Sequence, residues 1–170
     1  MGDPLLIRSA AVVVSLVCLG FNCFNLTEAQ AVQPEKAAVP MIHVTDLFRP
    51  HDDPDDHWDL ACVDALAAQG KVDLQGVLID YPKPLRANDP DVMAVAQLNY
   101  LTGKTVPVMV GASRWFDPAE LTDAQDDPDL RGIRAMLDIM RASATPLAIN
   151  VLGSCRDVAM AGRLEPELFA

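Results

Sequence analysis

The chain has 170 residues, of which 51% are hydrophobic and 22% are charged. This is enough apolar material for one packed domain. The formal net charge is −11, and because nucleic acids are bound through clustered Lys and Arg, this balance argues against a nucleic acid as partner. The absence of a Gly-rich phosphate loop from the sequence argues against a nucleotide-cofactor enzyme.

The N-terminal segment predicts export. Arg8 precedes an apolar run from Ala10 to Leu19, and the small residues of Ala29-Gln30-Ala31 follow. This order is typical of a cleavable secretory signal peptide. The run is shorter than the roughly 20 residues that a membrane span requires, so no stable span is expected, although a retained anchor is the alternative. We therefore expect residues 1–31 to be removed from a periplasmic or secreted protein.

After this segment, a tether is expected over residues 32–40 and a folded domain over 41–170. Two cysteines lie in the expected domain, Cys62 and Cys155. Export permits a disulfide bond between them, and free thiols are equally compatible with the pattern. A homo-oligomer is compatible with the composition as well.

Short apolar runs alternate with helical segments from Met41 onwards. The runs are rich in Val, Ile and Leu and too continuous for half-exposed antiparallel strands, so they predict buried parallel strands. They are Met41–Val44, Leu74–Ile79, Val106–Val110 and Leu147–Leu152.

The segments between these runs have a period near 3.6, and their apolar stripes are of the kind that packs on a core. The stripes are Ile133, Met136, Leu137 and Met140; Leu60, Val63 and Ala67; and Met93, Ala96 and Tyr100. The alternation predicts an α/β fold: a Rossmann-like, mainly parallel sheet with flanking helices.

Acidic residues mark the expected helix starts. Asp-Pro-Asp occurs at 53–55, 89–91 and 127–129, and residues 117–120 have capping-box spacing. The densest patch, Asp52-Asp53-Pro54-Asp55-Asp56, holds more carboxylates than capping needs. Its surplus lies with Asp46 beyond the first predicted strand, where open α/β sheets bind ligands. An all-oxygen cluster suits Ca²⁺ or Mg²⁺, and helix capping alone is the alternative explanation.

Two segments carry a resemblance to a known family. Val44-Thr45-Asp46 followed by the run from Pro54 to Leu60 resembles the first-strand motif of inosine-uridine-preferring nucleoside hydrolases. The run Asp-Asp-His-Trp-Asp-Leu is closer still to a divergent branch of that superfamily. Further similar segments follow in the family's order up to about Phe169: Leu74–Val77, Val106–Val108 with Gly111, and Val151–Gly153 with Ala159–Ala161.

The resemblance implies a Ca²⁺ site, with Mg²⁺ less favoured, and hydrolysis of N-glycosidic bonds in ribonucleosides or related sugar compounds. Asp46 resembles the carboxylate that touches the metal and takes a proton from the attacking water. Asp56 resembles a bidentate metal ligand, Asp55 the partner of a ribose hydroxyl, and the carbonyl of Leu152 a further metal ligand. Trp58 is a candidate wall for the sugar or base, or else a core residue.

The sequence departs from the family pattern in three places. The loop from Asp46 to Asp55 is long, so that Asp52-Asp53 is an alternative metal-site pair, and Asp80-Tyr81-Pro82 stands where the family has Gly-Asn. Relative to the family, the chain is C-terminally truncated and lacks a late His-Asp pair. The alternative function is therefore a non-catalytic or truncated member that keeps the metal-binding half without turnover. His51 and His57 are weaker candidates for ligand contacts.

Overall fold

The computed structural model describes residues 37–47, 54–80, 90–124 and 126–170. The predicted signal peptide, the alternative pair Asp52-Asp53 and His51 lie outside the described residues. The first strand begins at Val39, two residues before the expected start of the domain. None of the helices in the described ranges is both long and apolar enough to cross a membrane.

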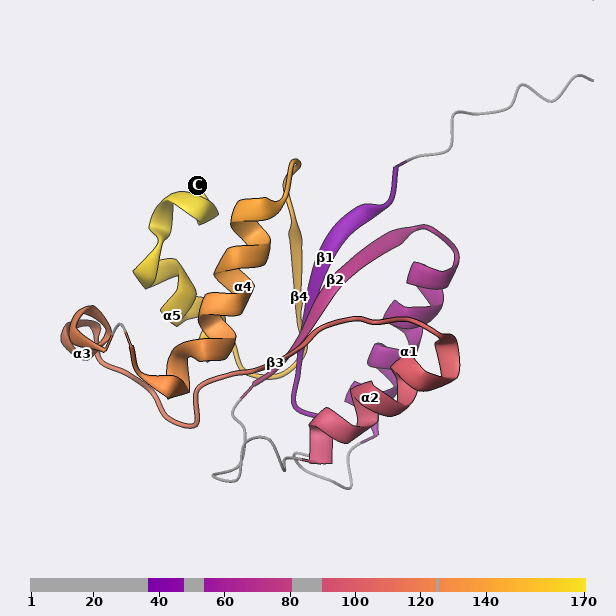
Figure 1. Cartoon of the computed structure of the whole chain (residues 1–170), viewed down its shortest axis with the longest axis horizontal. Helices are drawn as coiled ribbons and strands as arrows, with labels where there is room; N and C mark the ends of the chain where they lie inside the picture. The colour runs from indigo at the N-terminus through magenta and orange to yellow at the C-terminus, as the bar shows by residue number, and fades with distance from the viewer. Residues whose placement is uncertain (1–36, 48–53, 81–89, 125) are drawn as a thin grey trace, which may run out of the picture. The chain divides into compact units, whose positions relative to one another are not determined.

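The centre of the fold is a four-stranded, all-parallel sheet with the strand order β3-β2-β1-β4 (Figure 1). Every strand overlaps one of the predicted apolar runs, and the predicted Rossmann-like α/β class is confirmed. The strands are β1 (Val39–Thr45), β2 (Val72–Ile79), β3 (Val108–Val110) and β4 (Ala148–Val151).

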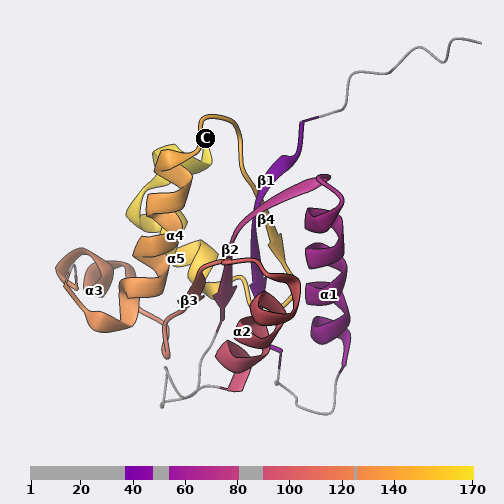
Figure 2. The ribbon, with the colours of Figure 1, turned by 45° about the vertical axis from the view of Figure 1, so that its right-hand side comes forward.

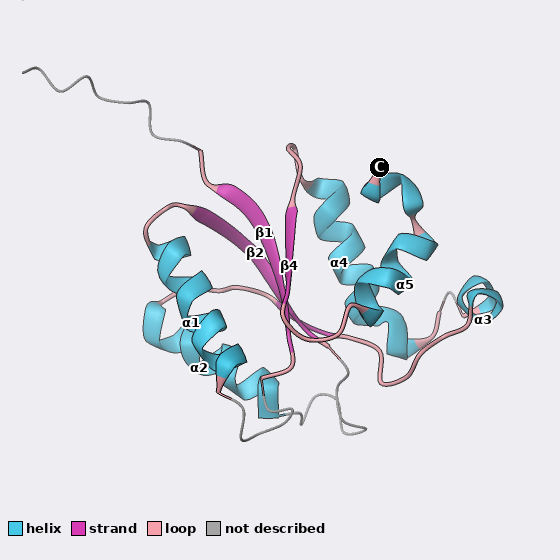
Figure 3. Cartoon of the chain, turned by 180° about the vertical axis from the view of Figure 1, so that it is seen from behind, coloured by secondary structure: helices cyan, strands magenta, loops and turns pink. Residues whose placement is uncertain are grey.

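Helices cover both faces of the sheet (Figures 1 and 3). On one face lie α1 (Asp55–Ala68) and α2 (Pro90–Thr102); on the other lie α3 (Pro118–Asp123), α4 (Arg131–Ala142) and α5 (Arg156–Leu164), with the short 3₁₀ helices η2 (Pro128–Leu130) and η3 (Pro166–Phe169). The chain builds outwards from β1 to β3 and then returns to place β4 on the other side of β1. The direction of winding therefore switches between β1 and β4.

Alternate residues of the strands supply two separate cores. Ile42, Val44 and Leu78 pack towards α4 and α5, whereas Val77 and Ile79 pack towards α1 and α2. The stripe predicted for α4 is confirmed, because Ile133, Met136 and Leu137 are buried and Met140 packs beside them. The stripe of α1 is confirmed as well, since Leu60 and Val63 are buried.

The stripe predicted for α2 is wrong, although the helix itself forms. Met93 and Tyr100 point to solvent, and the inward residues are Val95, with Val92 and Leu98 packed beside it. The physical reason is that α2 is apolar around most of its circumference, so that its periodicity does not select one face. Contact with β2 and β3 determines which side of α2 is buried.

Candidate metal centre

The candidate site lies at the carboxyl ends of β2, β1 and β4. Asp46 directly follows β1, Asp80 follows β2, and residues 152–155 follow β4. The backbone N–H of Asp80 donates to the Thr45 carbonyl at 2.9 Å, and that of Leu152 donates to the Val44 carbonyl at 3.0 Å. These bonds hold the three strand ends side by side, next to the point where the winding switches. Ligands of open α/β sheets bind at this position.

Asp55 and Asp56 reach the same edge from the first turn of α1. The N-cap of this helix is Pro54, which makes no side-chain capping bond, and the N–H of Asp56 donates to the Asp55 carboxylate at 3.0 Å. Asp55 is exposed, whereas Asp56 is only 7% exposed. The Asp55 carboxylate therefore makes only a local backbone contact at the surface, whereas the carboxyl of Asp56 is buried.

The carboxyl group of Asp56 lies in a crowded negative environment. Burial raises its pKa most, and a side-chain hydrogen bond with Asp46 and the negative charges of Asp46, Asp55 and Asp80 raise it further, to about 7. The structure thus brings the predicted residues Asp46, Asp55 and Asp56 together. Around neutral pH the cluster holds a proton that an ordinary aspartate would have lost.

Asp80 is a member of this cluster that sequence reasoning missed. Its side chain is fully buried and accepts a hydrogen bond from the backbone N–H of Ser154. A Cβ added at Gly153 would lie 2.5 Å from Asp80 Oδ2, so the loop after β4 closes on this carboxylate only because residue 153 is glycine. The sequence feature that could have identified Asp80 is its position directly after β2, the strand beside β1.

The other predicted site residues occupy different surroundings. Leu152 directly follows β4, is 39% exposed and lies at the edge of the site. Trp58 is 71% exposed on α1, which makes the core interpretation wrong. Its contact with a substrate stays a prediction. Cys62 and Cys155 are both free and exposed, and the disulfide between them is absent.

A buried histidine that sequence reasoning also missed lies on the α1 side of β1. His43 is fully buried, with Nε2 3.3 Å from the Asp59 carboxylate and Nδ1 3.1 Å from Asn150 Nδ2. Asn150 Nδ2 also donates to Asp59 at 3.2 Å. Burial lowers the pKa of His43, and the charge of Asp59 opposes that shift only in part. The sequence feature that could have identified this site is a histidine within the mostly apolar strand β1.

The loop that follows β3 is held by two buried aspartates. Asp157 accepts from the N–H of Ala112 at 2.8 Å, and Asp129 accepts from the hydroxyl of Ser113 at 2.8 Å. Asp157 is fully buried, although it lies in the first turn of α5. Phe116, fully buried, anchors the end of the loop.

The donor chemistry fits a hard cation, although the side chains are not yet arranged around one. Within the described ranges, no three His, Cys, Asp or Glu side chains stand in positions that could hold one ion. Asp46 and Asp56 are instead hydrogen-bonded to each other. All the groups at the site offer oxygen, which Ca²⁺ and Mg²⁺ prefer, and a cation would neutralise the mutual repulsion of the carboxylates.

Comparison with known proteins leaves the family open. No protein-family model matches the chain, and no curated protein matches it.

Proposed function

We propose that the carboxylate cluster binds a divalent cation, Ca²⁺ in preference to Mg²⁺, and that this site serves the hydrolysis of N-glycosidic bonds in ribonucleosides or related sugar compounds. Asp46, Asp56 and the carbonyl of Leu152 would hold the ion, with Asp80 as a further negative charge beside them. One observation supports the cation: burial raises the pKa of the Asp56 carboxyl most, and three neighbouring carboxylates raise it further, to about 7. The reaction is proposed from the resemblance to nucleoside hydrolases.

The preference for Ca²⁺ follows from the irregular origin of the donors. The candidate oxygens come from the ends of β1 and β4 and from the first turn of α1. Ca²⁺ accepts about 6–8 oxygens in flexible geometry, whereas Mg²⁺ demands a near-ideal octahedron. Because ligands must be deprotonated, binding should release the proton that Asp56 holds at neutral pH.

The chain's own residues would divide the work of hydrolysis. A bound Ca²⁺ supplies Lewis-acid activation of water and contacts for sugar hydroxyls. Asp46, half-buried at the end of β1, accepts the proton of the water, a role that contributes about 10²–10⁴-fold to the rate of such reactions. Asp55 and Trp58, both exposed on the first turns of α1, would contact the sugar.

A second function, cation binding without turnover, is favoured by the positions of the histidines. His43 is buried against Asp59 and Asn150, and His57 lines a groove between α1 and α2. His43 is therefore held by structural contacts and is no candidate for the acid that would protonate a leaving base, and His57 contributes to the wall of this groove. Release of an unprotonated base is slower, since general-acid help is worth about 10²–10⁴-fold.

Calorimetric titration with CaCl₂ tests the metal site. Asp46→Ala and Asp56→Ala should each abolish most of the binding, because each removes a ligand and its charge. Asp138→Ala, an exposed aspartate on α4, is the matched control and should bind as the wild type does. Equal affinity in all four proteins would refute the site.

Base release separates the two functions. Inosine, uridine and a chromogenic ribofuranoside would be incubated with the Ca²⁺-loaded chain, with Asp46→Asn as the blank. Release that depends on Asp46 supports the hydrolase. Tight Ca²⁺ binding with no release above the blank supports cation binding without turnover.

A further inference from the structure

The Asp80 side chain joins two strands that are not neighbours in the sheet. Asp80 directly follows β2, and its carboxylate accepts a hydrogen bond from the backbone N–H of Ser154, in the loop after β4. The strand order β3-β2-β1-β4 places β1 between them (Figure 2). Neighbouring strands lie about 4.8 Å apart, so β2 and β4 are separated by roughly 10 Å. The contact therefore spans the carboxyl end of β1, from which the chain continues into Asp46.

The surroundings of Asp80 favour a strong and lasting contact. The side chain is fully buried, so that water does not compete for the bond. A bond from a backbone N–H to a carboxylate is stronger than one between neutral groups. Ser154 extends the contact to the start of α5, because its Oγ accepts from the N–H of Arg156 at 3.2 Å. The loop after β4 is thus held from both the β2 side and the α5 side.

Leu152 lies between two anchor points of this loop. Its own N–H donates to the Val44 carbonyl at 3.0 Å, and Asp80 holds the N–H of Ser154. The residue between them is Gly153, whose backbone is freer than that of any other residue type. Without the bond to Asp80, the peptide group that carries the Leu152 carbonyl would be fixed on one side only.

Asp80 is itself fixed next to the carboxylates of the candidate site. Its N–H donates to the Thr45 carbonyl at 2.9 Å, which ties it to the residue before Asp46. Its side chain also lies within electrostatic range of Asp56. One side chain therefore contacts the loop after β4 and adjoins the cluster formed by the end of β1 and the start of α1.

From these contacts we infer that Asp80 is a positioning residue for the Leu152 carbonyl at the cation site. By bonding the Ser154 N–H, Asp80 holds this carbonyl beside Asp46 and Asp56 before a cation binds. In this role it acts through the loop, in addition to the charge that it contributes. The inference rests on the proposed cation site. Loss of a group that orients metal ligands weakens metal affinity by about 10–100-fold.

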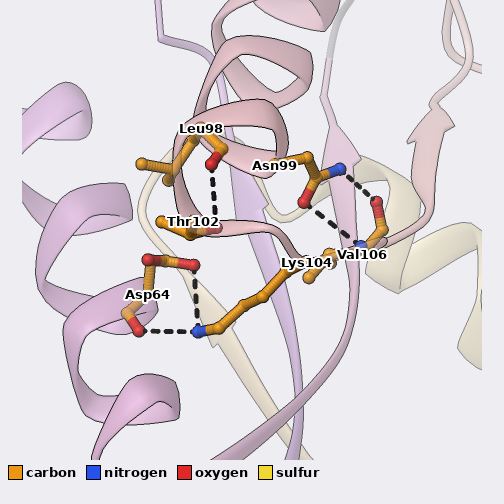
Figure 4. Close-up of polar contacts among 6 residues, drawn as sticks. All are labelled: Asp64, Leu98, Asn99, Thr102, Lys104 and Val106. Carbon is orange, nitrogen blue, oxygen red and sulfur yellow. Dashed lines mark hydrogen bonds and ion pairs between the residues drawn. The ribbon is translucent and has the colours of Figure 1, made fainter.

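Two substitutions of Asp80 separate its bond from its charge. Asp80→Asn and Asp80→Ala both remove the negative charge, but only Asn retains an oxygen that can accept from the Ser154 N–H. The chain already uses an amide in this way, because Asn99 Oδ1 accepts from the Val106 N–H at 3.2 Å (Figure 4). In calorimetric titration with CaCl₂, Asp80→Ala should bind about 10-fold or more weakly than Asp80→Asn. Equal affinities of the two variants would overturn the inference.

Asp64→Ala is the matched control for the loss of a buried aspartate. Asp64 is 6% exposed, and the Lys104 ammonium donates to its carboxylate at 3.2 Å (Figure 4). Lys104 lines a hollow with the first residues of β2, at the opposite ends of the strands from the candidate site. This variant should keep the wild-type affinity for Ca²⁺. A loss as large as that of Asp80→Ala would show a general effect of destabilisation and would overturn the inference.

Hydrogen exchange in the presence of a chelator tests the loop without any cation. The Ser154 amide should be protected in the wild type and in Asp80→Asn and should exchange faster in Asp80→Ala. The amide of Gly111, which donates to the Ile79 carbonyl at 2.8 Å, should stay protected in all three and reports that the sheet is folded. Unchanged protection of Ser154 in Asp80→Ala would overturn the inference.

A second pair of variants leaves Asp80 intact and decides the question if Asp80→Ala does not fold. Ser154→Pro removes the N–H that Asp80 binds, whereas Ser154→Ala retains it. Ser154→Pro should bind Ca²⁺ about 10-fold or more weakly than Ser154→Ala, and equal affinities would overturn the inference. A wild-type chain that binds no Ca²⁺ would refute the proposed cation site itself, whereas equal affinities within a pair refute only the role of Asp80.

Discussion

Replacement of Asp56 by Asn should stabilise the cation-free protein while removing cation binding. The pKa of Asp56 is raised from 3.8 to about 7 in the folded chain. The stability that comes from its protonated carboxyl is therefore fully present below pH 3.8 and is lost as the pH rises through about 7. Above that pH the wild-type Asp56 is charged beside three other carboxylates, whereas the Asn side chain of the variant is neutral.

The magnitude follows from the size of the shift. A displacement of about three pKa units corresponds to an upper limit of about 4 kcal/mol. Penetrating water and relaxation of the carboxylates reduce this, and we expect Asp56→Asn to raise the free energy of unfolding by about 1–2 kcal/mol at pH 8. At pH 4 the variant and the wild type should differ little, because the wild-type carboxyl is then protonated.

Urea denaturation between pH 4 and pH 8, with a chelator and then with CaCl₂, measures these effects. A cation present at 100 times its dissociation constant adds about 2.7 kcal/mol to the wild type, and the variant should gain almost nothing. Asp138→Asn, which changes an exposed carboxylate on α4, serves as the control. If Asp56→Asn lowered stability at pH 8, the electrostatic reasoning would be wrong. An equal gain from CaCl₂ would show that Asp56 is no ligand.

Four other outcomes are expected. Asp80→Asn should lower the pKa of Asp56, because it removes one of the neighbouring charges; carboxyl NMR titration would show an unchanged value if Asp80 were outside the cluster. Gly153→Ala should destabilise the chain by about 1–3 kcal/mol in urea denaturation, since its Cβ would overlap the Asp80 carboxylate, and a neutral effect would contradict this contact. Burial lowers the pKa of His43, so the stability that its neutral ring provides is present above pH 6.5 and is lost as the pH falls further. The free energy of unfolding of His43→Gln should therefore fall less steeply between pH 6.5 and 5 than that of the wild type. Parallel pH dependences of the two proteins would argue against a buried neutral ring. Mass spectrometry of the exported protein should find a mature chain that starts at Val32, and a retained Met1 in membranes would favour an anchor instead.

The strands were predictable because buried parallel strands are continuous apolar runs that need no pairing information to be seen. The convergence of Asp46 and Asp56 was predictable too, since a strand end and the following helix start are close in sequence. Asp80 was missed because its role depends on β2 lying beside β1 and on a glycine in the loop after β4. The inward face of α2 could not be read from a helix that is apolar on both sides.

His43 was missed for a related reason, because its partners come from elements far apart in the chain. The burial of its ring requires both the Asp59 carboxylate of α1 and the amide of Asn150 on β4. Neither neighbour can be inferred from a strand of seven residues. A polar residue in an apolar strand signals that some partner exists, but the fold alone identifies it.

The position of β4 also bears on the order in which the sheet assembles. β1, β2 and β3 follow one another through single helical crossovers, whereas β4 must find β1 from the far end of the chain. The bond between His43 and Asn150 joins residues 107 positions apart. Contacts of such long range form late, because the entropy of closing the loop is lost before the pairing is gained. Addition of β4 should therefore limit the folding rate, and the β1 edge would be open to intermolecular pairing until β4 arrives.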